Sequence, residues 1–235
     1  MATTAPASAS AARLRTLADA QERVGDVPLA RILMRPYPGT GTVLDILDPT
    51  VTQGRGVELI DGILVEKPMG FDEDSLAFWL GVQLFNFASV HNLGKFGGSQ
   101  GMIRLGDTLV RTPDISFTRW DSVDDPAELD QLPGPFLHVA PDLVVEVLSE
   151  SNTPREMQIK LGEYAAAGVK LVWYVDPDAK TVTVYPRGRE RGRKVLGVGD
   201  TLDGGKVLPG FALPVADLFA PRAPKPMKRP KKPKK

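Results

Sequence analysis

Two acidic residues lie inside short apolar runs, where a charged side chain is uncommon. Glu146 interrupts the run Leu143–Leu148, and Asp114 follows a proline inside VRTPDISF. Taken singly, Glu146 is explained as an acid at a strand end that reaches solvent or as half of a structural ion pair, and Asp114 as an ordinary aspartate of a turn or sheet edge. Because an ionised carboxylate is costly to bury without a partner, these positions predict that something pairs with them.

Two further charged residues can join the same set. Lys160 lies within the apolar stripe of a predicted helix, at three- and four-residue spacings from apolar neighbours. A lysine on that side needs an anionic partner, unless its stem carries the amine out to solvent. Glu58 lies in a predicted hairpin and is either another carboxylate of the set or a solvent-facing residue of an alternating strand.

Together these residue types can hold a divalent metal ion next to a phosphodiester. Asp114 and Glu146, with the backbone carbonyl of Val147, would supply oxygen ligands. The metal would lower the pKa of a bound water and offset the charge that builds on phosphorus. Lys160 would orient that water or stabilise the transition state. The predicted catalytic residues are Asp114, Glu146, Lys160 and Glu58, and the predicted metal ligands are Asp114, Glu146 and Val147.

The composition narrows the choice of metal. The chain has no cysteine and only two histidines, His91 and His138. Thiolate ligands and disulfides are therefore excluded, and a histidine-built zinc site is not expected. Oxygen ligands favour Mg²⁺ or Mn²⁺, and the chemistry needs no organic cofactor.

Several predicted elements position these residues. The helix around Lys160 has complete end signals, with Thr153 as the N-cap, Pro154 at the first position, Glu156 closing a capping box and Gly168 at the end. A strand before it and a strand after it predict a parallel pair joined by a helical crossover. The predicted elements, in order, are a hairpin at 57–67 around Asp61-Gly62, a helix at 73–92, strands at 101–105 and 110–117, a polar loop at 119–138, a strand at 141–149, the helix at 154–167, strands at 171–176 and 181–186, and a C-terminal β-rich extension.

The class is therefore mixed α/β, with one domain over residues 34–220. Residues 1–33 are predicted to be an N-terminal extension, which is either disordered or precedes an alternative translation start at Met34. Residues 221–235 carry eight Lys or Arg and no acid, which leaves 21 basic and 29 acidic residues in the first 220. This proline-rich tail should be disordered and serves either as a phosphate-gripping arm or as a solubilising extension. No apolar run is long enough for a bilayer span or a secretory signal, so we expect a cytoplasmic protein without membrane contact.

Five segments of the chain resemble the Uma2 family, also called DUF820, of the PD-(D/E)xK nuclease superfamily. These segments occur in the family's order: ELIDGILVE (58–66), RTPDISF (111–117), PDLVVEVLSESNT (141–153), KLGEYAAAGVKLVWYVDP (160–177) and LPGFALPVADLF (208–219). The resemblance implies a restriction-endonuclease-like αβββαβ core with an N-terminal β-hairpin and a C-terminal β extension. Its three central strands would be 101–105, 110–117 and 142–149.

The resemblance also implies roles for individual residues. The family's PD aspartate falls on Asp114, its second acid on Glu146 and the acid of its hairpin on Glu58. The usual lysine two residues after the second acid is absent, because position 148 is Leu. Lysine migration to the following helix is a known variation, and Lys160 is then the matching residue. Where many relatives have a histidine, this chain has Glu73 and Asp74.

The leading hypothesis is a Mg²⁺- or Mn²⁺-dependent endonuclease that hydrolyses phosphodiester bonds in double-stranded DNA. Since cutting both strands usually calls for two active sites, a homodimer is expected. An alternative is a catalytically inactive nucleic-acid-binding or assembly module that uses the same fold and the basic tail. A third is a metal hydrolase of a small phosphoester, because an acidic body steers DNA poorly.

Overall fold

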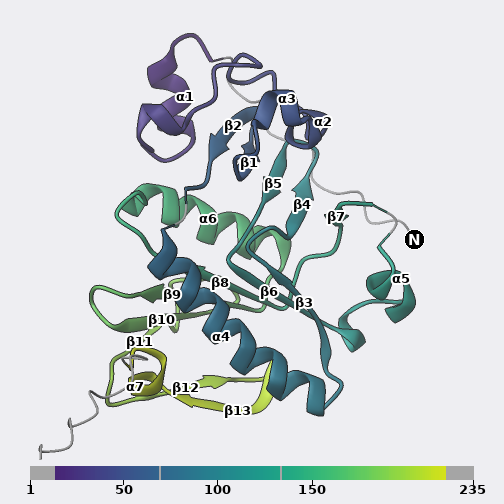
Figure 1. Cartoon of the computed structure of the whole chain (residues 1–235), viewed down its shortest axis with the longest axis vertical. Coiled ribbons are helices and arrows are strands. Elements are labelled where there is room, and N and C mark those ends of the chain that lie inside the picture. The colour runs from purple at the N-terminus through teal and green to yellow at the C-terminus, as the bar shows by residue number, and fades with distance from the viewer. Residues whose placement is uncertain (1–13, 69, 133, 221–235) are drawn as a thin grey trace, which may run out of the picture.

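The computed structural model describes residues 14–68, 70–132 and 134–220, which form two large β-sheets with helices packed on them (Figure 1). The central sheet has six strands in the order β11-β10-β9-β8-β6-β3. The second sheet has five in the order β2-β1-β5-β4-β7, and β12 pairs with β13. The predicted mixed α/β class is confirmed.

The strands are β1 (Val57–Ile60), β2 (Ile63–Glu66), β3 (Gly94–Gly98), β4 (Met102–Gly106), β5 (Leu109–Arg111), β6 (Ile115–Arg119), β7 (Phe136–Leu137), β8 (Leu143–Val147), β9 (Leu171–Asp176), β10 (Thr181–Pro186), β11 (Lys194–Leu196), β12 (Thr201–Gly204) and β13 (Leu208–Pro214). The helices are α1 (Leu17–Arg23), α2 (Val43–Leu47), α3 (Pro49–Thr52), α4 (Phe71–Val90), α5 (Pro126–Asp130), α6 (Pro154–Ala167) and α7 (Val215–Leu218), with short 3₁₀ turns at Leu29–Arg31 and Trp120–Ser122. Within the described ranges, no helix has the length and apolar character needed to cross a membrane.

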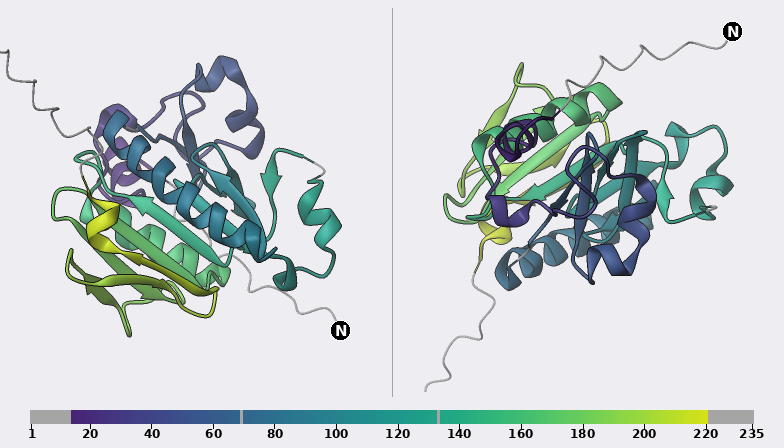
Figure 2. Two further views of the ribbon diagram at one scale, coloured as in Figure 1. Left: turned by 60° about the horizontal axis from the view of Figure 1, so that its bottom comes forward. Right: turned by 90° about the horizontal axis from the view of Figure 1, so that it is seen from above.

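The central sheet is covered on both faces. α4 packs on one face and α6 on the other (Figure 2). β8 is therefore buried along its whole length, as its nearly continuous apolar run predicted. β8 and β9 run parallel, with Val145 opposite Trp173, and α6 connects them. The predicted strand–helix–strand crossover is confirmed.

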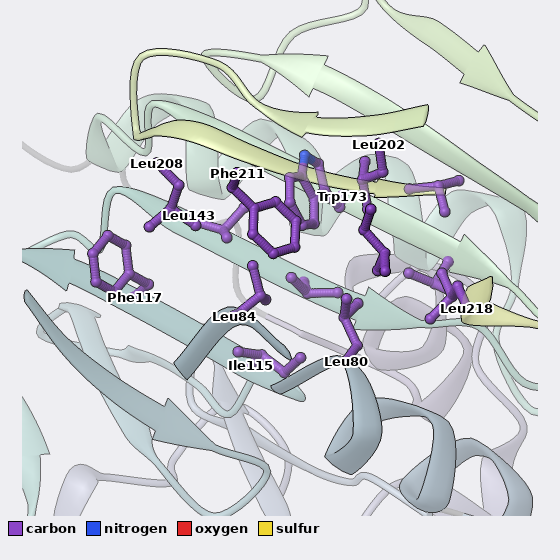
Figure 3. Packing of buried hydrophobic residues seen from close by; sticks show 14 of the residues in the cluster. Leu80, Leu84, Ile115, Phe117, Leu143, Trp173, Leu202, Leu208, Phe211 and Leu218 are labelled. Atoms are coloured by element: carbon purple, nitrogen blue, oxygen red, sulfur yellow. The ribbon is translucent and has the colours of Figure 1, made fainter. Parts of the chain in front are cut away.

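The larger core lies between α4 and the central sheet (Figure 3). Leu80 and Leu84 of α4 reach the sheet, where Leu143 and Trp173 are fully buried. Phe211 of β13 packs against the Trp173 ring at a centroid distance of 6.2 Å. Burying an apolar side chain of this size contributes about 1.5–3 kcal/mol, so this face is the main anchor of β8.

α6 begins and ends where its sequence signals predict. The Thr153 hydroxyl accepts a hydrogen bond from the Glu156 N–H, and the Glu156 carboxylate accepts one from the Thr153 N–H. Gly168 ends the helix in the left-handed conformation at φ 94°. These end groups fix where α6 starts, and so which of its side chains face β8.

The hairpin is also as predicted, since Asp61 and Gly62 both have positive φ in a two-residue turn. The single strand expected at 110–117 is wrong. β5 pairs with β1 in the second sheet, while β6 pairs with β8 in the central sheet. The chain changes sheets at residues 112–114, because a proline at 113 cannot donate to a ladder. Asp114 thus sits at a junction between sheets.

The predicted first central strand at 101–105 is wrong as well. β4, which covers it, lies in the second sheet, and β3 takes its place beside β6, with Phe96 opposite Phe117. β3 contains three glycines, and because glycine has a low strand propensity, this strand was not predicted from the sequence. At Gly94 the glycine is required, since a Cβ there would lie 2.1 Å from the carbonyl oxygen of Thr118. The segment predicted as a polar loop at 119–138 contains α5 and β7.

Residues 14–33 were predicted to lie outside the domain, and this is corrected. Ala20, Val24 and Val27 are buried against the hairpin. Arg31 pairs with Glu156 of α6 at 2.8 Å, with both side chains buried. Apolar residues spread among alanines gave too weak a pattern to predict this packing. Residues 1–13 and the tail at 221–235 lie outside the described residues, so the predictions made for them stay predictions.

Candidate active site

The two acids singled out from the sequence meet around a single cation. Asp114, at the junction between β5 and β6, places Oδ1 2.7 Å from the Lys67 ammonium. Glu146, in β8, places Oε2 3.2 Å from the same nitrogen. Both carboxylates are almost fully buried. In Figure 1 this corner lies where the second sheet, at the top, joins the central sheet below it.

Backbone and side-chain donors fix the other oxygens of these acids. The N–H of Val147 donates to Asp114 Oδ2 at 2.6 Å. The hydroxyl of Tyr164 donates to Glu146 Oε1 at 2.6 Å. Each carboxylate therefore has one oxygen tied to the protein scaffold and the other turned toward Lys67.

Lys160 and Glu58 belong to the same network. The Lys160 ammonium lies 3.3 Å from Glu58 Oε1 and 3.4 Å from Glu146 Oε1. The Lys160 side chain is only 1% exposed, so the alternative in which its amine reaches solvent is wrong. Glu58 is fully buried, and the alternative of a solvent-facing Glu58 is wrong too. The structure thus brings together all four residues of the predicted catalytic set.

Three charged members of the network, Arg111, Glu163 and Lys67, were not predicted from the sequence, nor was the donor Tyr164. Arg111 donates to Glu58 Oε2 at 2.7 Å and also pairs with Glu163 at 2.6 Å. Arg111 sits in the apolar strand LVR, which was a usable signal, because a buried guanidinium needs a carboxylate. No spacing rule connects Lys67 to Asp114, which lies 47 residues further along the chain.

The charges of this network control one another. Burial by itself would raise the pKa values of Glu58 and Glu146, but nearby cations outweigh it and lower both. Lys160 is the strongest of these cations for each acid. For Asp114, burial prevails, and with repulsion from Glu146 it raises the pKa despite the nearby Lys67. For Lys67, burial opposes the charged form, but the charges of Glu146 and Asp114 raise its pKa.

The Tyr164 hydroxyl stays protonated in this setting. Burial and then the negative charge of Glu146 raise its pKa well above the usual value. It can therefore only donate to the Glu146 oxygen, which stabilises that carboxylate in its ionised form.

The oxygen atoms around Lys67 suit a hard divalent cation. Asp114 Oδ1, Glu146 Oε2 and the carbonyl oxygen of Thr112 (2.6 Å) surround the ammonium of Lys67. All three are the oxygen donors that Mg²⁺ and Mn²⁺ prefer. Among the described residues no group of three or more His, Cys, Asp or Glu is arranged to hold a metal. The site can thus offer a metal two carboxylates, with backbone oxygen and water completing its shell.

The network opens to solvent on the Lys67 side. A cavity of about 390 Å³ is bordered by Lys67, Phe71, Asp74, Gln100 and Thr112. A more apolar groove between α4 and β3 borders Asp114 and shares Asp74 and Ser99 with this cavity. Lys160 borders neither hollow, and Lys67 is the more exposed of the two lysines, with 11% of its side chain accessible.

The comparisons with known proteins concern the family and the fold of the chain. The model of the Uma2 family, described as "Putative restriction endonuclease", matches residues 44–216. One similar solved structure is a protein from Anabaena variabilis ATCC 29413, described as a putative nuclease belonging to DUF820. It is 20% identical, with a TM-score of 0.60, over 70% of this chain and 90% of that one. Among curated proteins, none matches.

The fold is therefore similar to that of a protein described as a putative nuclease belonging to DUF820. In this chain, buried acids and lysines lie together at a junction between two sheets. Because the family match covers well over half of the sequence, the chain belongs to the Uma2 family.

Proposed function

We propose that this protein is a metal-dependent endonuclease that hydrolyses phosphodiester bonds in DNA. The observation that carries the proposal is the convergence of Asp114 and Glu146, from separate elements, on one cation position. The family's description as a restriction endonuclease supports nucleic acid as the substrate. A homodimer and a cytoplasmic location accompany the proposal as predictions.

Asp114 and Glu146 would hold Mg²⁺ or Mn²⁺ with the oxygens that face Lys67. A metal held there supplies positive charge and Lewis acidity beside the phosphodiester. The Val147 N–H keeps Asp114 oriented, and Tyr164 does the same for Glu146. The carbonyl of Val147 is the further ligand predicted from the sequence. Orientation of this kind matters, because a misplaced ligand costs rate even when all groups are present.

Lys160 contacts the Glu146 oxygen that does not contact Lys67. It touches Oε1 of Glu146 and Oε1 of Glu58, away from the oxygen that faces Lys67. Glu58 is itself held by Arg111 and by the Thr112 N–H at 3.1 Å. Lys160 therefore serves as a positioning residue that keeps Glu146 ionised, and Glu58 serves as a positioning residue that holds Lys160 in place.

The test is cleavage of plasmid DNA by the purified protein with Mg²⁺ or Mn²⁺, with and without EDTA. Asp114→Asn and Glu146→Gln should each lower the rate by at least about 100-fold, since each removes a charged metal ligand. Asp107→Asn is the matched control, because the Asp107 side chain is 99% exposed and its ion pair is with Arg104, outside the network. Wild-type rates in both site variants would contradict the proposal.

One observation favours a catalytically inactive nucleic-acid-binding module instead. Lys67 already balances Asp114 and Glu146, so the network is complete without a metal. Such a module would bind DNA with an affinity that falls as salt increases and that weakens when residues 221–235 are removed. It would not cleave DNA. A parallel assay with a generic small phosphodiester tests the third hypothesis. Hydrolysis of that compound without cleavage of DNA would indicate a hydrolase of small phosphoesters.

A further inference from the structure

Each N–H donor of the Lys67 ammonium can be matched with a nearby oxygen. An ammonium has three N–H donors, and three oxygens surround this one. They are the Thr112 carbonyl at 2.6 Å, Asp114 Oδ1 at 2.7 Å and Glu146 Oε2 at 3.2 Å. The Lys67 side chain is 11% exposed, whereas that of Lys160 is 1% exposed.

We propose that the Lys67 ammonium is an internal counter-ion that occupies the cation position between Asp114 and Glu146, and that a divalent metal binds there only by displacing it. The inference rests on the proposed function for the identity of the metal site. It assigns to Lys67 a regulatory role that the motif residues do not have.

The first argument is electrostatic. Two positive charges a few ångströms apart repel strongly in a site shielded from water. The ammonium and a metal would also compete for the same carboxylate oxygens. Lys67 and a metal therefore exclude each other, and the free energy of metal binding includes the cost of breaking the Lys67 contacts.

The second argument concerns the two carboxylates. If Lys67 left and nothing replaced it, Asp114 and Glu146 would lose the cation they share. A buried charge that loses its partner is strongly destabilising. Lys67 thus keeps the site folded and ready in the metal-free protein, and a metal takes over the same task.

The third argument concerns space. Lys67 borders the open cavity, together with Asp74 and Gln100, so its amine has room to move out on release. Lys160 has no such opening and pairs with the opposite oxygen of Glu146. Displacement should therefore involve Lys67 alone and leave Lys160 in place.

The experiment measures Mn²⁺ binding by isothermal titration calorimetry, without DNA. Lys67→Met should lower the Mn²⁺ Kd at least tenfold, because the competing charge is gone. Lys67→Arg keeps the charge and should stay within about threefold of wild type. Lys95→Met is the matched control, since the Lys95 amine contacts only the carbonyls of Leu129 and Asp130 among the hydrogen bonds described for it. It should bind Mn²⁺ as wild type does.

A second measurement covers the case in which Lys67→Met folds poorly. Circular dichroism melting with and without Mn²⁺ should show a larger metal-induced rise in Tm for Lys67→Met than for wild type. Equal or weaker Mn²⁺ binding by Lys67→Met, with no larger rise in Tm, would overturn the inference. So would a gain in Lys67→Arg equal to that in Lys67→Met.

The two proposals fail separately. If wild type cuts DNA with Mn²⁺ but Lys67→Met binds the metal no more tightly, the inference is overturned and the nuclease stands. If Lys67→Met binds Mn²⁺ at least tenfold more tightly and neither protein cuts DNA, the inference is supported and the nuclease falls.

Discussion

Replacing Lys160 by Met removes a buried cation that two carboxylates share. Glu58 would keep Arg111, and Glu146 would keep Lys67 and Tyr164. Removing one partner of a buried pair typically costs about 3–5 kcal/mol. Both acids retain other donors, and the Lys160 distances of 3.3 and 3.4 Å are long for an ion pair. We therefore expect the free energy of unfolding to fall by about 3 kcal/mol, the lower end of this range.

For a domain of this size, that loss corresponds to a Tm about 6–12 °C lower. Cleavage by Lys160→Met should fall at least about 100-fold, equivalent to about 2.7 kcal/mol of activation free energy. Calorimetry and a plasmid cleavage assay with Mn²⁺ measure the two effects.

The double variant Lys160→Met/Glu58→Gln separates positioning from direct catalysis. Glu58→Gln removes the acid that Lys160 neutralises, so the double variant should be more stable than the sum of the single effects predicts, by about 0.5–3 kcal/mol. If Lys160 acts through Glu146, part of the lost cleavage should return as well. Strict additivity in stability, with no recovery of cleavage, would refute the positioning role.

Three further predictions follow from single contacts. Tyr164→Phe should destabilise the fold by about 1–2 kcal/mol and slow cleavage, because the Glu146 oxygen loses its 2.6 Å donor; chemical unfolding and cleavage rates measure this. Arg31→Met leaves the buried carboxylate of Glu156 without its guanidinium and should lower the free energy of unfolding by about 3–5 kcal/mol in urea. The pKa of Glu58 is lowered, so its contribution to stability is present above the unfolded value of about 4.3 and is lost as pH falls toward the folded value. Glu58→Gln should therefore show a shallower loss of stability than wild type below about pH 4.3, and equal slopes would contradict this.

The sequence predicted those parts of the fold that follow from neighbouring residues. The turn at Asp61-Gly62 depends on backbone sterics, and the ends of α6 depend on hydrogen bonds among Thr153, Glu156 and Gly168. Both were correct in type and position. Lys160 could be placed toward the core for a similar reason, because side chains three and four residues apart share one side of a helix.

Other features depended on which segments pair, and these were decided only in three dimensions. The strand expected at 110–117 divides between two sheets, and β3 rather than β4 joins the central one. Strand pairing reflects register and burial across the whole sheet, which a local pattern does not contain. Lys67 was missed on the same ground, since its proximity to Asp114 arises only when the hairpin meets the junction between the sheets.

By itself, then, the sequence determined the class of residues at the site, because charged groups in apolar runs must find partners. Asp114, Glu146, Lys160 and Glu58 follow from this requirement. Only the tertiary structure decided which cation pairs with each acid. Lys67 is partly exposed and pairs with Asp114, whereas Lys160 is buried and pairs with Glu58. The physical reason is that short-range rules specify what a residue requires, whereas the packing of distant segments decides which group meets that requirement.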